Sequence, residues 1–204
     1  RARLPLQGAT DVAVEAAGGV AYVAAKGSLF VVDVSRPERP VLVGQLQGLG
    51  QGRQVEVARG IAAVTTRPDG LFVCDVSDPE HPSLLSHYDT VELATGVCLS
   101  GALCLVACRH MGVEIVDLSD PRRPTHVSNV LAGEAQSVFV DGSTMYVGAW
   151  MQREVHIVDI ANPAMPRTLG VCPLDGFGDG IYVQDGLCYA ATGHHARRFT
   201  NRRK

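Results

Sequence analysis

The stretch Leu29-Phe30-Val31-Val32-Asp33-Val34-Ser35-Arg36-Pro37-Glu38-Arg39-Pro40 decides the fold, because its Asp-x-x-x-Pro-x-x-Pro pattern recurs along the chain. The pattern restarts every 42 residues, at Asp33, Asp75, Asp117 and Asp159. The last proline keeps the same phase in every copy, at Pro40, Pro82, Pro124 and Pro166. A fixed period of this length is the sequence signature of a repeat architecture, so the chain is predicted to consist of repeated structural units.

Each unit contains four short apolar segments separated by turn residues. In the second unit these segments cover residues 55–57, 61–64, 71–76 and 83–86. The links between them are short and carry Gly, Pro, Asp or Ser, which suits an antiparallel meander and leaves no room for a crossover helix. The first unit is one residue shorter than the others around Lys26-Gly27-Ser28, where a loop between the second and third strands can absorb the change.

A four-stranded sheet of this size cannot cover both of its apolar faces by itself. Units stacked radially bury those faces against each other, which is the principle of a β-propeller. Leucine-rich and β-helix repeats are shorter, and helical repeats near this length need amphipathic helices that the Gly and Pro positions forbid. The predicted fold class is therefore all-β, a β-propeller of four-stranded antiparallel blades with about 42 residues per blade.

We expect one β-propeller domain over residues 1–193 and a basic loop or tail over residues 194–204. The blade units cover residues 10–51, 52–93, 94–135 and 136–177, with a partial unit over residues 178–193. Residues 4–6 are expected to form the outer strand of a preceding blade. The chain thus holds about five blades, four of them near-complete, and we expect it to be part of a larger propeller. In the alternative, the two ends combine into a fifth, incomplete blade that closes the ring.

The composition excludes two classes of partner. The formal net charge of −3 gives no general attraction to nucleic acid or to anionic membrane surfaces. No apolar stretch approaches the roughly 18 residues that a membrane-spanning helix needs, and residues 1–10 contain no signal-peptide core. We expect no nucleic-acid partner and no membrane-spanning segment, and we assign no function to the basic tail.

Six cysteines are scattered without the paired spacing of a zinc ribbon or a redox motif. They are Cys74, Cys98, Cys104, Cys108, Cys172 and Cys188. Most occupy positions where other units carry small or apolar residues, so we interpret them as free thiols in the core. A bridge between Cys98 and Cys104 across one hairpin is the alternative in an oxidising compartment.

The recurring aspartates could form a ring of acids for metal binding, but a structural role fits their position better. In three copies the Asp stands at a strand end and is followed two positions later by Ser. Such an Asp can accept hydrogen bonds from the backbone of the proline-containing turn and fix the link to the outer strand.

A ligand site is expected at the entrance of the central channel, on the face shared by the blade-joining loops and the loops between the second and third strands. The blade-joining loops end in polar residues, each two positions before an inner strand. With one loop tryptophan, these residues form the candidate ligand-binding set: Thr10, Arg53, Thr95, Gln136, Asp179 and Trp150. Their mixed chemistry is unlike that of a symmetric metal cage.

The same face carries the candidate metal ligands His110 and His194. With a carboxylate such as Glu134 or Asp179 they could bind a divalent metal, because imidazole and carboxylate suit zinc, manganese or iron. Since adjacent residues of an extended segment point to opposite sides, only one of His194 and His195 would face a given site. Solvent-exposed loop histidines are the simpler interpretation.

No sequence motif for nucleophilic catalysis or phosphate binding is present, and no catalytic residue is assigned. The Gly-rich residues 48–52 and 175–180 lack a following helix whose N-terminus could hold an anion, so they are interpreted as flexible blade-joining loops.

The stretch from Leu29 to Gly44 and its three later echoes resemble the LVIVD repeat family. Glu114-Ile115-Val116-Asp117 and His156-Ile157-Val158-Asp159 come closest to the name-giving string, and the resemblance covers residues 10–192. It implies a propeller of bacterial or archaeal type in an extracellular, cell-surface or periplasmic protein, and it brings no catalytic residues.

These observations favour a non-enzymatic binding or scaffold module that presents one loop face to a protein or glycan partner and needs no cofactor. The alternative is a metal-dependent hydrolase or lyase on the same face, with a divalent metal held by His110 and His194.

Overall fold

The structure is a computed structural model that describes residues 2–15 and 19–192. This part of the chain contains sixteen β-strands and no helix, so none that is long and apolar enough to cross a membrane. The all-β prediction is confirmed. Within each sheet every strand pairs antiparallel with its neighbour in the sequence.

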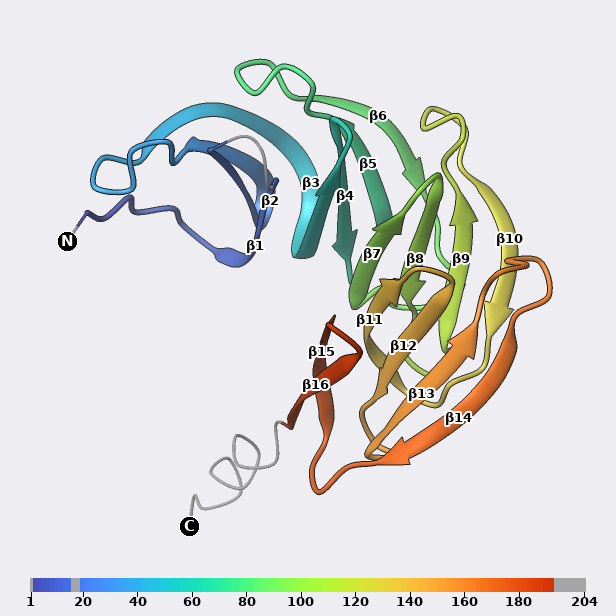
Figure 1. Ribbon diagram of the computed structural model, residues 1–204. Coiled ribbons are helices and arrows are strands. Elements are labelled where there is room, and N and C mark those ends of the chain that lie inside the picture. The colour runs from blue at the N-terminus through green and yellow to red at the C-terminus, as the bar shows by residue number, and fades with distance from the viewer. Residues whose placement is uncertain (1, 16–18, 193–204) are drawn as a thin grey trace, which may run out of the picture.

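The strands form four blades and one partial blade (Figure 1). Blade 1 consists of β1 (Ala9–Val14), β2 (Val20–Asp33) and the first part of β3 (Val41–Ala58), and blade 2 of the rest of β3, β4 (Ile61–Thr66), β5 (Gly70–Asp75) and β6 (Ser83–Tyr88). Blade 3 consists of β7 (Gly96–Ser100), β8 (Leu103–Ala107), β9 (Val113–Asp117) and β10 (Thr125–Val130). Blade 4 consists of β11 (Ala135–Asp141), β12 (Thr144–Ala149), β13 (Glu154–Asp159) and β14 (Arg167–Pro173). Partial blade 5 is the two-stranded sheet of β15 (Gly178–Gln184) and β16 (Leu187–Thr192).

Strand β2 turns back on itself near its middle. Its residues 21–25 pair with β1, and its residues 26–33 pair with β3. The backbone N–H of Val34 donates to the carbonyl of Gly19 at 2.7 Å, so the two ends of β2 lie side by side. Gly27 makes the tight reversal with a φ of 82°, which glycine adopts without strain. Strand β2 therefore supplies both the second and the third strand of blade 1.

Strand β3 belongs to two blades. Its residues 41–51 pair with β2 in blade 1, and its residues 52–58 pair with β4 in blade 2. The outer strand of blade 1 therefore continues without interruption into the inner strand of blade 2, and blades 1 and 2 share one six-stranded sheet. The blade-joining loop predicted over residues 48–52 is part of this strand, which corrects the expectation that these glycines form a flexible loop.

The recurring aspartates close the turn that follows the third strand of each blade. The Oδ1 atom of each Asp accepts the backbone N–H two residues later, at distances between 2.7 and 3.0 Å. At Asp75 and Asp117 the Ser hydroxyl also donates to the same oxygen. These hydrogen bonds lower the pKa of the Asp75 and Asp117 carboxyl groups. The aspartates thus have the structural role that the sequence predicts.

The hydrophobic core lies between the blades as three clusters. Tyr22 and Leu29 of blade 1 pack with Val64 of blade 2, whereas Ala63, the residue before Val64, packs with Val106 of blade 3. Alternate residues of a strand point to opposite faces of its sheet, so one strand serves both neighbours. A third cluster joins blades 3 and 4 through Leu105, Ile115, Met145 and Val147, among others. Each sheet therefore buries its faces against the next sheet, as a propeller requires.

A second contact between successive blades recurs at the rim. The Ser86 hydroxyl of blade 2 donates to the Pro121 carbonyl of blade 3 at 2.7 Å, and the Ser128 hydroxyl of blade 3 donates to the Pro163 carbonyl of blade 4 at 2.6 Å. Blade 1 has Gly44 at the equivalent position, and a Cβ there would overlap the Pro79 carbonyl oxygen of blade 2. The outer strand of one blade thus packs directly on the proline turn of the next.

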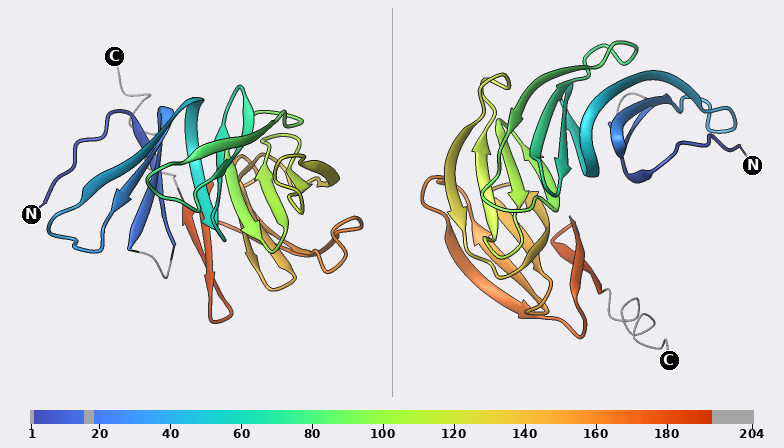
Figure 2. Two further views of the ribbon diagram at one scale, coloured as in Figure 1. Left: turned by 90° about the horizontal axis from the view of Figure 1, so that it is seen from above. Right: turned by 180° about the vertical axis from the view of Figure 1, so that it is seen from behind.

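The blades follow one another around an arc, with the inner strands β3, β7, β11 and β15 towards its centre (Figures 1 and 2). The arc is open between blade 1 and partial blade 5. Apolar side chains are exposed on the two flanking units, among them Val14 of β1 and Leu187 and Tyr189 of β16. The described residues therefore form a propeller-like arc and not a closed ring.

One further expectation is wrong, and the alternative of a disulfide bridge is not observed. Residues 4–6 form no strand, because no strand of the described chain lies beside them to share hydrogen bonds. Cys98 and Cys104 form no disulfide. Cys98 pairs with Leu105 and packs between blades 3 and 4, whereas Cys104 pairs with Leu99 and packs between blades 2 and 3, so the two thiols lie on opposite faces of the sheet. All six cysteines are free, and Cys172 and Cys188 are exposed.

Candidate ligand-binding site

The channel mouth is formed by the first residues of the inner strands. Arg53, Gln136 and Asp179 lie inside β3, β11 and β15, Thr10 lies inside β1, and Thr95 directly precedes β7. The predicted set, Trp150 excepted, therefore occupies equivalent positions in successive blades. These residues are anchored in the sheets, however, and not in free loops as the sequence suggested.

Two of these residues hold neighbouring blades together. The Thr95 hydroxyl lies within hydrogen-bond distance of the Ala107 carbonyl, at 2.9 Å, and of the Ala135 carbonyl of blade 4, at 3.0 Å. Thr10 makes the equivalent contacts with Ala24 and with Gly52 of blade 2. Thr95 is fully buried, so its hydroxyl serves the packing of blades 3 and 4.

Arg53 and Gln136 meet across the mouth from blades 2 and 4. The Arg53 Nη2 atom donates to the Gln136 Oε1 atom at 3.4 Å. The Arg53 Nε atom is buried and has no hydrogen-bond partner in the described part of the chain. Burial lowers the pKa of Arg53, and the charge of Arg67 adds to this effect, while Asp179 and Asp11 act in the opposite direction. The mouth therefore holds a guanidinium group whose charge is incompletely compensated.

A small basic pocket lies beside Arg53. We call it the mouth pocket; its volume is about 150 Å³, and it is lined by Thr10, Lys26, Gln51, Gly52, Arg53 and Arg67. Lys26, Arg53 and Arg67 form no ion pair with any residue that the structure describes. Three cationic side chains around one small cavity form an environment that favours an anion.

Sequence reasoning missed Lys26 and Gln51 as members of the mouth pocket. Lys26 lies at the turn between the second and third strands of blade 1, which corresponds to the turn of blade 2 that carries Arg67. A comparison of these two turns could have found it. Gln51 could not be found in this way, because it pairs with Lys26 only through the continuous strand β3.

The remaining loop residues are mostly engaged in packing. The Arg109 side chain forms an ion pair with the buried Glu134 at 2.9 Å. Trp150 is buried, and its ring packs against Phe177 with 4.7 Å between centroids. The Arg153 guanidinium lies over the Phe177 ring, with its Cζ atom 5.0 Å from the ring centroid. Trp150 therefore stabilises the approach to partial blade 5 and lies apart from the mouth pocket.

The described chain does not assemble the predicted metal site. His110 lies in an exposed loop, Glu134 is occupied by Arg109, and His194 and His195 lie outside the described residues. In the ranges 2–15 and 19–192 no group of three or more His, Cys, Asp and Glu side chains is placed to hold a metal ion.

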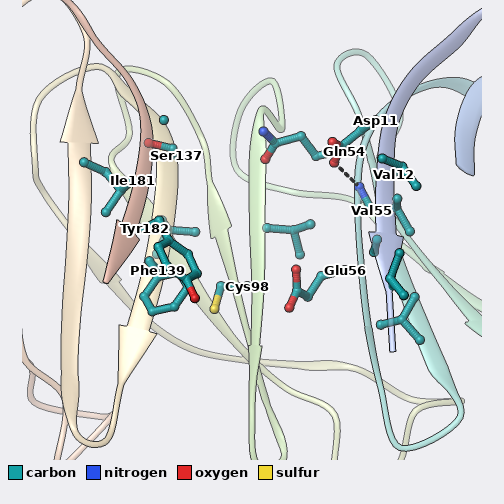
Figure 3. Close-up of a pocket in the computed structure, with 16 residues that line it drawn as sticks. Asp11, Val12, Gln54, Val55, Glu56, Cys98, Ser137, Phe139, Ile181 and Tyr182 are labelled. Carbon is teal, nitrogen blue, oxygen red and sulfur yellow. Dashed lines mark hydrogen bonds between the residues drawn. The ribbon is translucent and has the colours of Figure 1, made fainter. Parts of the chain in front are cut away.

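Below the mouth, the channel widens into a cavity of about 490 Å³ between the inner strands of all the blades. We call it the channel cavity. Asp11, Gln54, Glu56, Cys98, Phe139 and Tyr182 are among the residues that line it (Figure 3). Asp11 accepts a hydrogen bond from the backbone N–H of Val55 at 3.0 Å.

The profile of the LVIVD repeat matches the sequence four times, over residues 8–47, 50–90, 93–131 and 132–172. The chain belongs to the LVIVD repeat family. The four matches coincide with the four blades of the structure, so each LVIVD repeat is one blade. A comparison with curated proteins finds no match.

Solved structures share the fold of these LVIVD repeats. A protein of unknown function from Desulfotomaculum acetoxidans DSM 771 superposes with a TM-score of 0.79 at 16% identity, over 90% of this chain and 62% of its own. Hydrazine synthase of Kuenenia stuttgartiensis gives a TM-score of 0.71 at 17% identity, over 91% of this chain and 55% of its own. The computationally designed protein Ika8 gives 0.61 at 10% identity, over 90% of this chain and 68% of its own. This chain thus spans less than two thirds of the length of each of the two natural proteins. The likeness concerns the fold alone.

Proposed function

We propose that this chain is a non-catalytic binding module that holds an acidic group of its partner in the mouth pocket. The observation that carries the proposal is the convergence of Lys26, Arg53 and Arg67 on one cavity without a compensating ion pair among the described residues. The mouth pocket lies at the channel entrance, on the loop face, where a large partner can reach it. The absence of a catalytic motif in the sequence supports a binding role.

The energetics of Arg53 favour an oxyanion as the bound group. A buried donor without an acceptor costs about 1–3 kcal/mol, and the Arg53 Nε atom is such a donor. A carboxylate placed between Arg53 and Arg67 would accept from the terminal N–H groups of both guanidinium groups and relieve the repulsion between them. The mouth pocket has room for one such group, at about 150 Å³.

The partner can carry this carboxylate on a glycan or on a protein, and binding measurements distinguish the two. We suggest titration calorimetry of the chain with oligogalacturonate and with a polyglutamate peptide at low ionic strength. One of the two probes is expected to bind. Arg67→Ala is expected to lower the affinity for that probe about tenfold, which is the contribution of one charge-assisted contact. Addition of salt should also weaken it, because the contact is electrostatic.

The matched control is Arg36→Ala, an exposed arginine in the proline turn of blade 1, outside the mouth pocket. It should leave the affinity unchanged. The proposal fails if neither probe binds, or if Arg36→Ala and Arg67→Ala weaken binding equally. The proposal includes a position outside the cytoplasm, which family resemblance supports and which cell fractionation tests.

A further inference from the structure

The channel cavity is a site of different chemistry from the mouth pocket. Its volume of about 490 Å³ lies within the usual range of small-molecule sites, roughly 300–1,000 Å³. Its lining contains the acids Asp11 and Glu56 and no Lys, Arg or His. The remaining lining residues include the apolar residues Val12, Val14 and Ile181.

Glu56 lacks a partner of opposite charge in this cavity. Burial and, to a smaller extent, the nearby charge of Asp11 raise the pKa of Glu56 to about 6. No hydrogen bond to the Glu56 carboxylate is made by the residues that the structure describes. An ionised carboxylate that is partly withdrawn from water and has no donor is destabilised, so a bound cation would stabilise it.

An aromatic pair lines the same cavity. Phe139 of β11 and Tyr182 of β15 make an edge-to-face contact with 5.3 Å between ring centroids. Figure 3 shows these rings on one side of the cavity and Glu56 on the other, with Cys98 between them. Aromatic faces attract cations and also pack against apolar groups.

We propose that the channel cavity binds an organic ammonium ion, with the ammonium group at Glu56 and Asp11 and an apolar or aromatic body against Phe139 and Tyr182. A divalent metal fits less well, because Ca²⁺ takes about 6–8 oxygen ligands and this wall offers two carboxylates among many apolar side chains. This inference does not rest on the proposed function, since it concerns other residues and a ligand of opposite charge.

The test uses benzylamine and benzyltrimethylammonium as cationic probes, with benzyl alcohol as the neutral probe of similar shape. Binding to the chain is measured by saturation-transfer NMR and titration calorimetry at pH 7.5. Both cations are expected to bind at least about tenfold more tightly than benzyl alcohol, since a charge-assisted contact is worth that factor. Glu56→Gln should remove this preference while leaving weak binding of all three probes.

Two variants separate the parts of the site. Tyr182→Leu should weaken all three probes by similar factors, because it removes an aromatic surface that packs against the body of each probe. Arg67→Ala, the variant that tests the mouth pocket, should leave all three affinities unchanged, so failure of one proposal is distinguishable from failure of the other. Circular dichroism and the midpoint of thermal unfolding confirm that each variant is folded.

Three results would overturn the inference. Equal affinity for benzylamine and benzyl alcohol would show an apolar cavity without charge recognition. Unchanged cation binding in Glu56→Gln would place the cations elsewhere. Stoichiometric binding of Ca²⁺ that Glu56→Gln abolishes would identify a metal site in its place.

Discussion

The raised pKa of Glu56 makes the free energy of unfolding depend on pH. Its pKa is about 6 in the folded chain, against an ordinary value of 4.5. Between these two values the folded state binds more protons than the unfolded state, so the free energy of unfolding falls as the pH rises. The contribution of this group is therefore most favourable below pH 4.5 and is fully lost above pH 6.

Glu56→Gln is expected to raise the free energy of unfolding at pH 7.5 by about 1 kcal/mol. The shift corresponds to roughly 2 kcal/mol, which is halved here because water screens a side chain that is only partly buried. Urea unfolding at pH 7.5 and pH 4 measures the difference, which should disappear at the lower pH. Glu38→Gln, in an exposed turn, is the control and should show no such dependence. An equal gain at both pH values would contradict the assignment.

The sequence predicts residues whose role is local and misses those whose role depends on other blades. The Asp75 turn could be predicted because Ser77, its partner, is two residues away. Glu56 was not predicted, since its environment is set by Cys98, Phe139 and Tyr182 from three other strands. These four residues do occupy one equivalent position of the repeat, so an alignment of the units with each other would have shown that they share the channel.

At the scale of elements, the contact between an outer strand and the next proline turn decides how closely two blades approach. Ser86 and Ser128 make this contact through their hydroxyl groups. Gly44 makes it with its backbone alone, because a Cβ would overlap the Pro79 carbonyl oxygen. Gly170 is the equivalent residue of blade 4, and a Cβ there meets no described atom within 4 Å.

Gly44→Ala is expected to lower the free energy of unfolding by about 1–3 kcal/mol, because blade 2 must move away from blade 1 to admit the methyl group. Gly170→Ala is the matched control, and it should be neutral or stabilise by about 0.4–1 kcal/mol through the unfolded state. Urea unfolding of both variants tests the pair. Similar losses at the two positions would show that the effect comes from glycine itself and not from the contact.

The number of strands in a blade could be predicted from the sequence, but not where one strand ends and the next begins. The glycines around residue 50 suggested a flexible loop, yet Gly52 pairs with Thr66 inside β3. A Cβ at Gly52 would lie 2.6 Å from the Ala25 carbonyl oxygen. Glycine is therefore needed there for close approach of two strands, a requirement that composition does not distinguish from flexibility.

At the scale of the whole molecule, stability depends on how many neighbours each blade has. Blades 2 and 3 are covered on both faces, whereas blade 1 and partial blade 5 each pack against one neighbour in the described chain. In repeat proteins stability is approximately a sum of unit terms and nearest-neighbour terms. Blade 1 and partial blade 5 therefore receive less stabilisation from neighbouring blades than blades 2 and 3 do.

Amide hydrogen exchange should follow this order. The slowest exchange is expected in β4, β5, β8 and β9, and the fastest among the strands in β16, which opens without disturbing the central clusters. Mass spectrometry of peptides after exchange in deuterated buffer measures it. Uniform protection from β1 to β16 would indicate one fully cooperative unit and contradict the nearest-neighbour description.

The propeller could be predicted from the repeat period alone, because sheets with apolar faces that recur every 42 residues must cover one another. The number of blades that would close a ring could not be predicted, since a repeat pattern specifies how one unit meets the next and not how many units are needed to return to the first. The arrangement of partial blade 5 depends on contacts such as that of Trp150 with Phe177, which lie outside the repeat pattern.

Strand β3 has a consequence for how this molecule can be divided. The 18 residues of β3 pair with β2 in the first LVIVD repeat and with β4 in the second. These two repeats are therefore joined by a hydrogen-bonded strand and not by a flexible linker, and separating them would disrupt strand pairing. Recombination of units is instead favoured at residues 89–95, where the second and third repeats are joined without a shared strand. The smallest exchangeable piece at this end of the chain is thus a pair of repeats, although the sequence period counts them singly.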